Sequence, residues 1–381
     1  MPVLRRLGCS VLALGLLAGC APPRTGPASS PTNNGAKADA VIRIVRDFMT
    51  QAHLKAVLVR VTVAGKEVVT RAVGDSMTGV PATTAMHFRN GAVAISYVAT
   101  LLLKLVDEKK LRLDPDYVLG NEAFDAELYA NPFRQWTTQE LLDQISSRPL
   151  LYDPGTNWNY AHTNYLLLGL ALEKAAGQDM PTLLQRKVLS PLGLTATANS
   201  DTPAIPEPAL HAFTSERRAA LKIPAGVPFY EESTFWNPSW TITHGAIQTT
   251  TIYDMEATAV GIGSGRLLSA DSYKKMVSTE LRGKTRAQPG CPTCFEQNDG
   301  YSYGLGIVIS GHWLLQNPMF AGYAAVEAYL PSQRVAVAVA VTYAPEAFDD
   351  QGNYRNQADI LFRKIGAEVA PNDAPPMPPG R

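Results

Sequence analysis

The chain has 381 residues, 46% of them hydrophobic and 18% charged, a composition typical of a globular protein that buries one large core or two smaller ones. Lysine plus arginine and aspartate plus glutamate number 34 each, so the formal net charge is zero and nothing favours a nucleic-acid partner. The sequence shows no internal repeat that would indicate a solenoid or an array.

The N-terminal residues have the layout of a secretory signal. Arg5 and Arg6 precede an apolar stretch, residues 7–17, that is too short to span a bilayer stably. Residues 17–20 then read Leu-Ala-Gly-Cys. This ending resembles the bacterial lipobox, whose cysteine is lipidated and becomes the first residue of the mature protein. A plain signal peptide that happens to contain Cys20 is the alternative.

The lipobox resemblance predicts a signal peptide over residues 1–19, a lipid on Cys20 and a flexible tether over residues 20–40. Proline, serine, threonine and glycine are frequent in that tether. The lipid would hold the protein on the extracytoplasmic face of the bacterial cell membrane. No apolar run after Cys20 is long enough to form a transmembrane helix.

The other cysteines indicate a disulfide rather than a metal site. Cys9 and Cys20 lie in the leader, which leaves Cys291 and Cys294 in the mature chain. A zinc site would need a second pair, and a thioredoxin-like redox pair would need a strand-to-helix context that this Gly- and Pro-rich loop lacks. Outside the cytoplasm we therefore expect a loop-closing disulfide. The scattered histidines share no metal-ligand spacing, so no metal and no cofactor are expected.

Strand patterns lie near both ends of the mature chain. Residues 56–63 are rich in β-branched side chains and turn at residues 64–66 into residues 67–70, which predicts a hairpin. Residues 92–106 are apolar nearly all round, so a helix there should be buried. Further strands are expected over residues 324–341, where valine and alanine dominate.

The strands bracket a largely helical middle, about residues 115–235. This pattern is expected when an all-α region is inserted into a mixed α/β (α+β) domain, here residues 41–368. The end of the chain, residues 369–381, is rich in proline and poor in apolar side chains, so we expect it to be disordered.

Three blocks of sequence match the motifs of one enzyme family. Residues 88–95 read Phe-Arg-Asn-Gly-Ala-Val-Ala-Ile, similar to a helix opening Phe-Arg-x-Gly-Ser-x-x-Lys. Residues 154–160 read Pro-Gly-Thr-Asn-Trp-Asn-Tyr, and residues 322–331 lead into a Val-rich run. Together they resemble the penicillin-binding protein and class C β-lactamase-related serine hydrolase family. The resemblance implies a serine β-lactamase-like fold, an antiparallel sheet flanked by helices with an inserted mostly helical region.

The residues that carry the family's chemistry are missing at the first motif. Ala92 stands at the nucleophile position and Ile95 at the position of the lysine that takes its proton. Neither side chain can attack a carbonyl or carry a proton. Tyr160 matches the tyrosine of the second motif, and His162 replaces its asparagine partner. Ser96, one turn beyond Ala92, is expected to point into packing.

The third motif has also changed. The family pattern His-x-Gly or Lys-Thr-Gly falls on Gln316, Asn317 and Pro318. A proline ring adds bulk where the family glycine lets substrate lie flat against the strand. The backbone N–H groups of Ala92 and Met319 would still offer a weak oxyanion pocket.

Three functions follow from this sequence. The first is a catalytically silent lipoprotein that binds a peptidoglycan fragment, a β-lactam-like ligand or an envelope protein. The second is an esterase or peptidase of the family that uses unconventional residues around Tyr160 and His162. The third is a structural envelope component with a closed cleft. Loss of the nucleophile together with its base favours the first.

Overall fold

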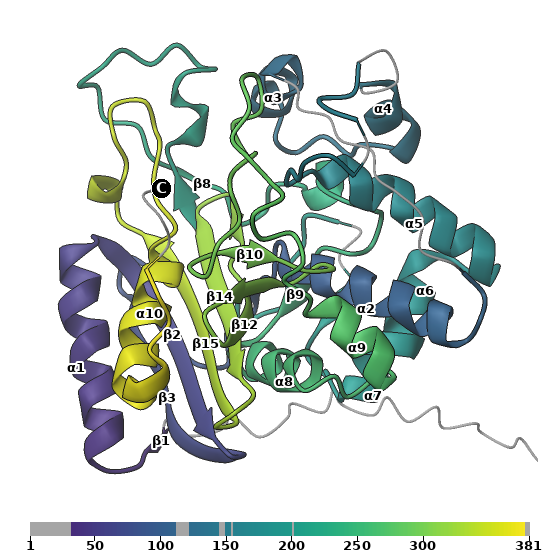
Figure 1. The fold of residues 1–381 in the computed structure, drawn as a ribbon. Helices are drawn as coiled ribbons and strands as arrows, with labels where there is room; N and C mark the ends of the chain where they lie inside the picture. Colours follow the sequence, from purple (N-terminus) through teal and green to yellow (C-terminus); the bar gives the residue numbers. More distant parts are fainter. Residues whose placement is uncertain (1–31, 112–121, 145–148, 154, 200–201, 378–381) are drawn as a thin grey trace, which may run out of the picture. The chain divides into compact units, whose positions relative to one another are not determined.

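The computed structural model describes most of the chain (Figure 1). The described residues are 32–111, 122–144, 149–153, 155–199 and 202–377. The expected signal peptide and Cys20 lie outside them.

One large antiparallel sheet organises the described residues. Its strands follow the order β1, β3, β2, β15, β14, β12, β11, β10, with β4 paired to β3 and β13 to β14. Their bounds are β1 Thr32–Asn33, β2 Leu54–Val63, β3 Lys66–Met77, β4 Val80–Pro81, β10 Ser302–Tyr303, β11 Val308–Ser310, β12 Trp313–Gln316, β13 Met319–Phe320, β14 Tyr323–Leu330 and β15 Val335–Tyr343. Strand β2 pairs with β15, so segments far apart in sequence lie side by side at the centre of the sheet.

The expected hairpin is confirmed, and its turn has a local cause. Val63 pairs with Lys66, which leaves Ala64 and Gly65 as a two-residue loop. Both have positive φ, 51° and 77°, as the type I′ turn requires. This turn matches the right-handed twist of the flanking strands, so β2 and β3 stay paired along most of their length.

Alternation along β15 decides what packs on each face of the sheet. Its valines, Val335 to Val341 at every second position, belong to the same core as apolar residues of α1 (Ala36–Gln51) and α10 (Gln357–Val369). Ala338 and Ala340 point to the opposite face. There the small side chains let α8 (Ile252–Gly263) contact β14 and β15 closely.

Further helices gather beyond α8, on the side of the sheet opposite α1 and α10 (Figure 1). Helix α2 (Val93–Asp107) is buried along most of its length, as its apolar composition predicts, and it contacts α5, α6 and α9. The remaining α-helices are α3 Glu122–Ala130, α4 Thr138–Asp143, α5 His162–Ala176, α6 Met180–Leu184, α7 Ser190–Leu192 and α9 Ala270–Met276. In the described part of the chain, no helix is both long and apolar enough to cross a membrane.

Short elements connect these helices. A small sheet has the order β5 (Phe88–Arg89), β9 (Gln248–Thr250), β6 (Ala198–Asn199), and β7 (Phe213–Thr214) pairs with β8 (Glu231–Glu232). One π-helical segment, Gln185–Leu189, continues α6. The helices expected over about residues 115–235 end earlier, at Leu192: the described residues between 193 and 251 form loops, short strands and 3-10 turns, and α8 and α9 follow them. Ile252, Met255, Ala259 and Ile262 are buried and form the apolar face of α8.

The expected tether is too long at its C-terminal end. Helix α1 begins at Ala36, and β1 pairs with β3 at residues 32–33. Ala38, Val41 and Val45 are fully buried. Their helical spacing gives α1 an apolar face that packs on the sheet, so residues 36–40 belong to the folded domain.

The disorder expected for residues 369–381 is wrong for the described part, which ends at residue 377. Residues Pro371–Asp373 form a 3-10 turn. The indole Nε1 of Trp313 donates to the Asp373 carbonyl oxygen at 2.7 Å, and Pro375 lies against Gly366. Proline backbones lack donors but keep their carbonyls, so donors from the domain can hold this segment without an apolar core of its own.

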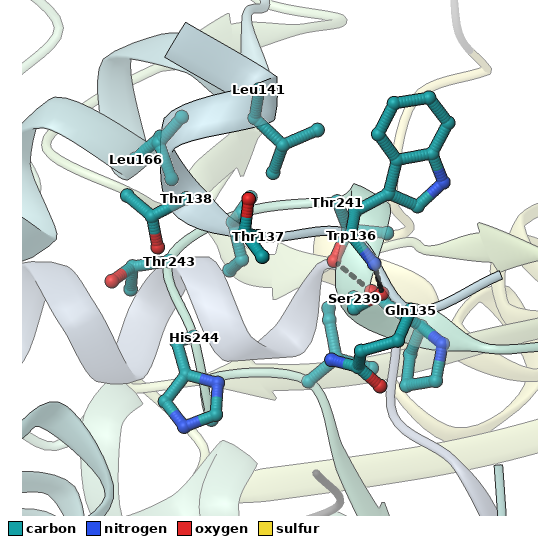
Figure 2. Close-up of a pocket in the computed structure, with 14 residues that line it drawn as sticks. Gln135, Trp136, Thr137, Thr138, Leu141, Leu166, Ser239, Thr241, Thr243 and His244 are labelled. Atoms are coloured by element: carbon teal, nitrogen blue, oxygen red, sulfur yellow. Dashed lines mark hydrogen bonds between the residues drawn. The ribbon is translucent and has the colours of Figure 1, made fainter. Parts of the chain in front are cut away.

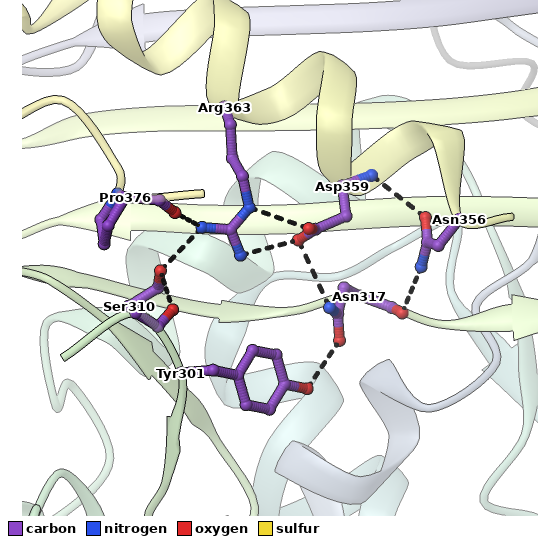
Figure 3. Close-up of polar contacts among 8 residues, drawn as sticks. Tyr301, Ser310, Asn317, Asn356, Asp359, Arg363 and Pro376 are labelled. Atoms are coloured by element: carbon purple, nitrogen blue, oxygen red, sulfur yellow. Dashed lines mark hydrogen bonds and ion pairs between the residues drawn. The ribbon is translucent and has the colours of Figure 1, made fainter. Parts of the chain in front are cut away.

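A buried ion pair joins this C-terminal segment to the sheet (Figure 3). Arg363 of α10 is 2% exposed, and its Nε lies 2.8 Å from Asp359 Oδ2. The same guanidinium donates to Ser310 Oγ at 2.8 Å and to the Pro376 carbonyl oxygen. Helix α10, strand β11 and the C-terminal segment thus share one buried cation.

Replacing Arg363 by alanine should strongly destabilise the domain. Asp359 is only 5% exposed and would keep a buried carboxylate without its partner, which costs about 3–5 kcal/mol. Urea unfolding followed by circular dichroism measures this loss. Glu368→Ala, at an exposed position of the same helix, is the control and should stay within about 0.5 kcal/mol of the parent. Equal midpoints for the two variants would contradict the role of the ion pair.

Candidate functional site

The turn that leads into α2 is held by a pair of amide side chains. Asn90 Nδ2 donates to Gln248 Oε1 at 2.9 Å, and the Gln248 backbone N–H donates to Asn90 Oδ1 at 2.9 Å. Gly91 takes a positive φ of 51°, and Ala92 is the N-cap of the helix. The fold therefore places residue 92 at a helix start, where a nucleophile would benefit from the helix dipole.

The position expected for the lysine is apolar and buried. Ile95 is 1% exposed and belongs to the main hydrophobic core. A Cβ built on Gly306 would lie 2.4 Å from Ala99 Cβ and 3.1 Å from the Ile95 carbonyl oxygen. The turn at residues 303–306 therefore packs directly against this face of α2. A charged amine here would lose its hydration.

Ser96 cannot replace the missing nucleophile. Its side chain is fully buried, and its Oγ donates to the Val93 carbonyl oxygen at 2.7 Å. This is the local side-chain-to-backbone bond that serine commonly makes within a helix. The structure thus agrees with the expectation that Ser96 points into packing.

Tyr160 and His162 lie together. His162 Nε2 is 3.3 Å from the Tyr160 hydroxyl. Burial lowers the pKa of His162 to about 4, so the imidazole is neutral at pH 7. Burial also raises the pKa of Tyr160 well above its usual value, with a smaller contribution from Tyr165. The phenol therefore stays protonated, and neither group carries a charge.

Gln316 is locked into the structure rather than presented to a ligand. It is 1% exposed, and its Nε2 donates to the Gly306 carbonyl oxygen at 2.7 Å and to the Tyr303 hydroxyl at 3.3 Å. The side chain therefore holds the 303–306 turn against α2. An amide in this role offers neither the positive charge nor the proton of the family's third motif.

Asn317 belongs to the opposite face of the sheet (Figure 3). Its Nδ2 donates to Asp359 Oδ1 at 3.3 Å, and its Oδ1 accepts from the Tyr301 hydroxyl at 3.4 Å. Its carbonyl oxygen accepts from Asn356 Nδ2 at 2.7 Å. Asn317 is thus part of the Arg363 network and not of the candidate site.

Pro318 fills space beside the start of α2. A Cβ built on Gly91 would lie 2.7 Å from Pro318 Cβ, so the proline ring packs directly against the residue that precedes Ala92. Met319 follows and is 39% exposed. The sequence predicts that this ring would obstruct a substrate lying along the strand, and the ring does lie beside the start of α2.

An aromatic row, which the sequence did not indicate, adjoins these residues. His162 and Trp240 have ring centroids 5.9 Å apart, and Trp240 stacks on Phe320 at 5.9 Å with an interplanar angle of 12°. Tyr303 lies 6.3 Å from Tyr160, centroid to centroid. The residues around the second motif therefore pack on one another through ring faces and edges.

The motif positions converge even though their chemistry is absent. Ile95 and Gln316 meet at Gly306, Pro318 meets Gly91, and Tyr303 links Gln316 to the Tyr160 ring. Sequence reasoning missed Gly306 and Tyr303. The available signal was Tyr-Gly-Leu-Gly at residues 303–306, since two glycines permit close backbone approach.

A small polar pocket lies near the first turns of α5 (Figure 2). It has a volume of about 290 Å³, and hydroxyl groups dominate its lining, from Thr137, Thr138, Thr241 and Thr243. His244 also lines it. Its size is at the lower limit of small-molecule sites. Neither Ala92 nor Pro318 lines it.

Two cysteines of the described residues are joined to each other. Cys291 and Cys294 form a disulfide with a Cα–Cα distance of 5.3 Å. Within the loop they close, Thr293 Oγ1 donates to Asn159 Oδ1, which ties the loop to the second motif. Among the described residues, no group of three or more histidine, cysteine or acidic side chains could hold a metal ion.

These features define a protein of the β-lactamase class, and the comparisons with known proteins place the chain in that family. The family model described as beta-lactamase matches residues 41–362, so the chain belongs to the β-lactamase family.

Individual relatives are more distant. Penicillin-binding protein 4 of Amycolatopsis lactamdurans is 31% identical over 141 residues, which are 31% of this chain and 37% of that protein. The chain spans only 22 to 37% of the length of the curated relatives that it matches.

Solved structures support the fold across nearly the whole domain. D-amino acid amidase from Ochrobactrum anthropi SV3, complexed with D-phenylalanine, has a TM-score of 0.70 at 18% identity and covers 87% of this chain and 99% of its own. A D-stereospecific amidohydrolase from Streptomyces has a TM-score of 0.63 at 19% identity. It covers 85% of this chain and 98% of its own. At these identities the likeness establishes the fold alone.

The lowered pKa of His162 predicts a pH-dependent contribution to stability. The unfolded chain takes up a proton on this imidazole below pH about 6.5, whereas the folded chain does so only near pH 4. Between these values the unfolded chain binds more protons, so the free energy of unfolding falls as the pH is lowered through this range.

Urea unfolding of the parent and of His162→Gln is measured at pH values between about 4 and 7. The difference between the two proteins gives the contribution of His162 to the free energy of unfolding. The parent should lose more stability than the variant as the pH falls. Identical pH slopes for the two proteins would show that the imidazole titrates alike in the folded and unfolded chains.

Proposed function

We propose that this protein is a catalytically silent lipoprotein of the β-lactamase family that binds a cell-wall peptide. The observation that carries the proposal is the pair Ala92 and Ile95 at the start of α2. They stand where the family chemistry needs a nucleophile and a base, while the surrounding turn remains in place.

The neighbouring groups support loss of turnover. Acyl transfer needs a hydroxyl or thiol to attack the carbonyl, a base to take its proton, and donors for the oxyanion. The methyl group of Ala92 provides no nucleophile, Ile95 lies in an apolar core, and the Gln316 amide is already bonded to Gly306. An acyl-enzyme intermediate therefore has no route of formation at residue 92.

The identity of the relatives supports the choice of ligand. One relative is named a penicillin-binding protein, and two structural neighbours are named for D-amino acid amides or D-stereospecific hydrolysis. A family member that keeps such a fold without its nucleophile is suited to binding without turnover. An envelope protein is the other partner compatible with this proposal.

The mature protein should form no covalent adduct with penicillin or with a fluorophosphonate. Both reagents report an activated nucleophile, which Ala92 cannot supply. Intact-mass spectrometry after prolonged incubation measures this, with a labelled serine penicillin-binding protein as the positive control. Stoichiometric addition of either reagent would overturn the proposal.

A hydrolase that uses Tyr160 and His162 is the alternative. It is favoured by one observation, the neutral His162 nitrogen that lies 3.3 Å from the Tyr160 hydroxyl and can accept its proton. The raised pKa of Tyr160 opposes it. Turnover of D-phenylalanine amide or a D-alanyl ester that Tyr160→Phe abolishes would establish this alternative in place of the proposal.

Membrane attachment through Cys20 forms the second part of the proposal. The Leu-Ala-Gly-Cys ending of the leader supports it. Cys20→Ala should move the protein from the membrane fraction to the soluble fraction, because the anchor would be lost. Fractionation with a salt wash and immunoblotting checks this, and Cys9→Ala serves as the control. Persistence of Cys20→Ala in the washed membrane fraction would count against the anchor.

A further inference from the structure

A second pocket, much larger than the polar one, is lined by residues of helices α2, α5 and α9 and of the 303–306 turn. Its volume is about 1190 Å³. Tyr160 lines one side of it, but Ala92, Ile95, Gln316 and Pro318 do not. The pocket is therefore adjacent to the motif positions without being the site where the family nucleophile would act.

The walls of this pocket are apolar and aromatic. Leu102 of α2 and Leu168 of α5 contribute aliphatic surface, and Trp158, Tyr165 and Tyr303 contribute rings. Trp158 packs on Tyr303 with centroids 4.9 Å apart and on Phe295 at 5.2 Å. These ring contacts fix the aromatic wall in one arrangement, so the wall can receive an aromatic or branched aliphatic group without reorganising.

Two amide side chains also line the pocket. Asn159 and Asn164 both contribute to its wall. The Asn159 Oδ1 accepts from Thr293, and the Asn164 Oδ1 is itself buried. Neither oxygen is therefore a free acceptor for a molecule in the pocket, and the two amides give the wall polar surface beside its rings.

The mouth of the pocket carries charges of both signs. Asp271, Lys274 and Lys275 lie on α9, Glu280 follows this helix, and all four are exposed. A ligand with a single charge would be attracted by two of these side chains and repelled by the other two. A ligand that carries an ammonium and a carboxylate can pair with both kinds of side chain.

We propose that this pocket is a non-catalytic binding site for a short zwitterionic peptide with an aromatic or branched aliphatic side chain. The side chain lies on the Trp158–Tyr303 wall, and the charged termini reach the α9 rim. This inference rests on the proposed binding function and specifies both where the peptide binds and what recognises it.

The test uses the dipeptide Leu-Phe as the probe, with isothermal titration calorimetry on the full mature protein. N-acetyl-Leu-Phe-amide, which lacks both charges, is the comparison ligand. Leu-Phe should bind at one site per chain and at least about fivefold more tightly than the capped peptide, because only Leu-Phe can use the rim charges. Absence of saturable binding, or equal affinity for the two peptides, would overturn the proposal.

Two variants locate the site. Ala171 lines the pocket and is exposed, so Ala171→Trp should fill the opening and weaken Leu-Phe binding at least about tenfold. Leu170→Trp is the matched control, because Leu170 is exposed on the same helix but does not line the pocket. It should leave the affinity within about twofold. Unchanged binding by Ala171→Trp would overturn the assignment.

A charge-reversed rim gives a test that does not depend on filling the pocket. Lys274→Glu with Lys275→Glu changes two exposed side chains, so the fold should survive, as circular dichroism can verify. This variant should weaken Leu-Phe about fivefold and leave the capped peptide unchanged. Equal effects on both peptides, or no effect, would contradict recognition of a zwitterion.

The two proposals can fail separately. A penicillin adduct would overturn catalytic silence, even where Ala171→Trp still abolishes Leu-Phe binding and so supports this pocket. A protein that forms no adduct but binds Leu-Phe equally well with and without Ala171→Trp would overturn the pocket alone.

Discussion

The alternation of valine and alanine along β15 is the constraint on which the rest of the structure depends. Every second side chain faces α1 and α10, where branched valines fill the core. The alternate alanines leave room for α8 to lie close to the strands. Because β15 pairs with β14, and β14 pairs in turn with β12 and β13, this pattern positions the two strands that flank residues 317–318.

The same packing explains why the fold persists without the family chemistry. Helix α2 is held by burial of its apolar side chains and by the Asn90–Gln248 amide pair, neither of which requires a reactive residue. Replacing a polar nucleophile and a lysine by Ala92 and Ile95 removes groups that are costly to bury. Stability and catalysis are therefore separate demands on these positions, and Ala92 and Ile95 meet the first.

Three polar side chains at the motif positions carry no charge. His162 is neutral, Tyr160 is protonated, and Gln316 holds a backbone turn. Binding free energy can still come from the neighbouring aromatic pocket, because apolar contact and a few directed polar groups do not need a nucleophile. This separation is the physical basis for assigning a binding role to a member of an enzyme family.

The sequence alone determined the features that depend on local pattern. These are the hairpin at Ala64 and Gly65, the buried helix after Ala92, and the absence of a nucleophile there. Strand alternation puts Asn317 and Gln316 on opposite faces, but the sequence could not determine which of the two faces α2 and which faces α10, because that depends on how the helices pack on the sheet. Only tertiary structure brought Trp240 beside His162 and Tyr303 beside Tyr160, since these contacts join residues more than 75 positions apart. Tertiary contacts also decided that the proline-rich segment folds as far as residue 377, where the described residues end. Its partners, Trp313 and Arg363, lie on elements that sequence pattern does not connect to it.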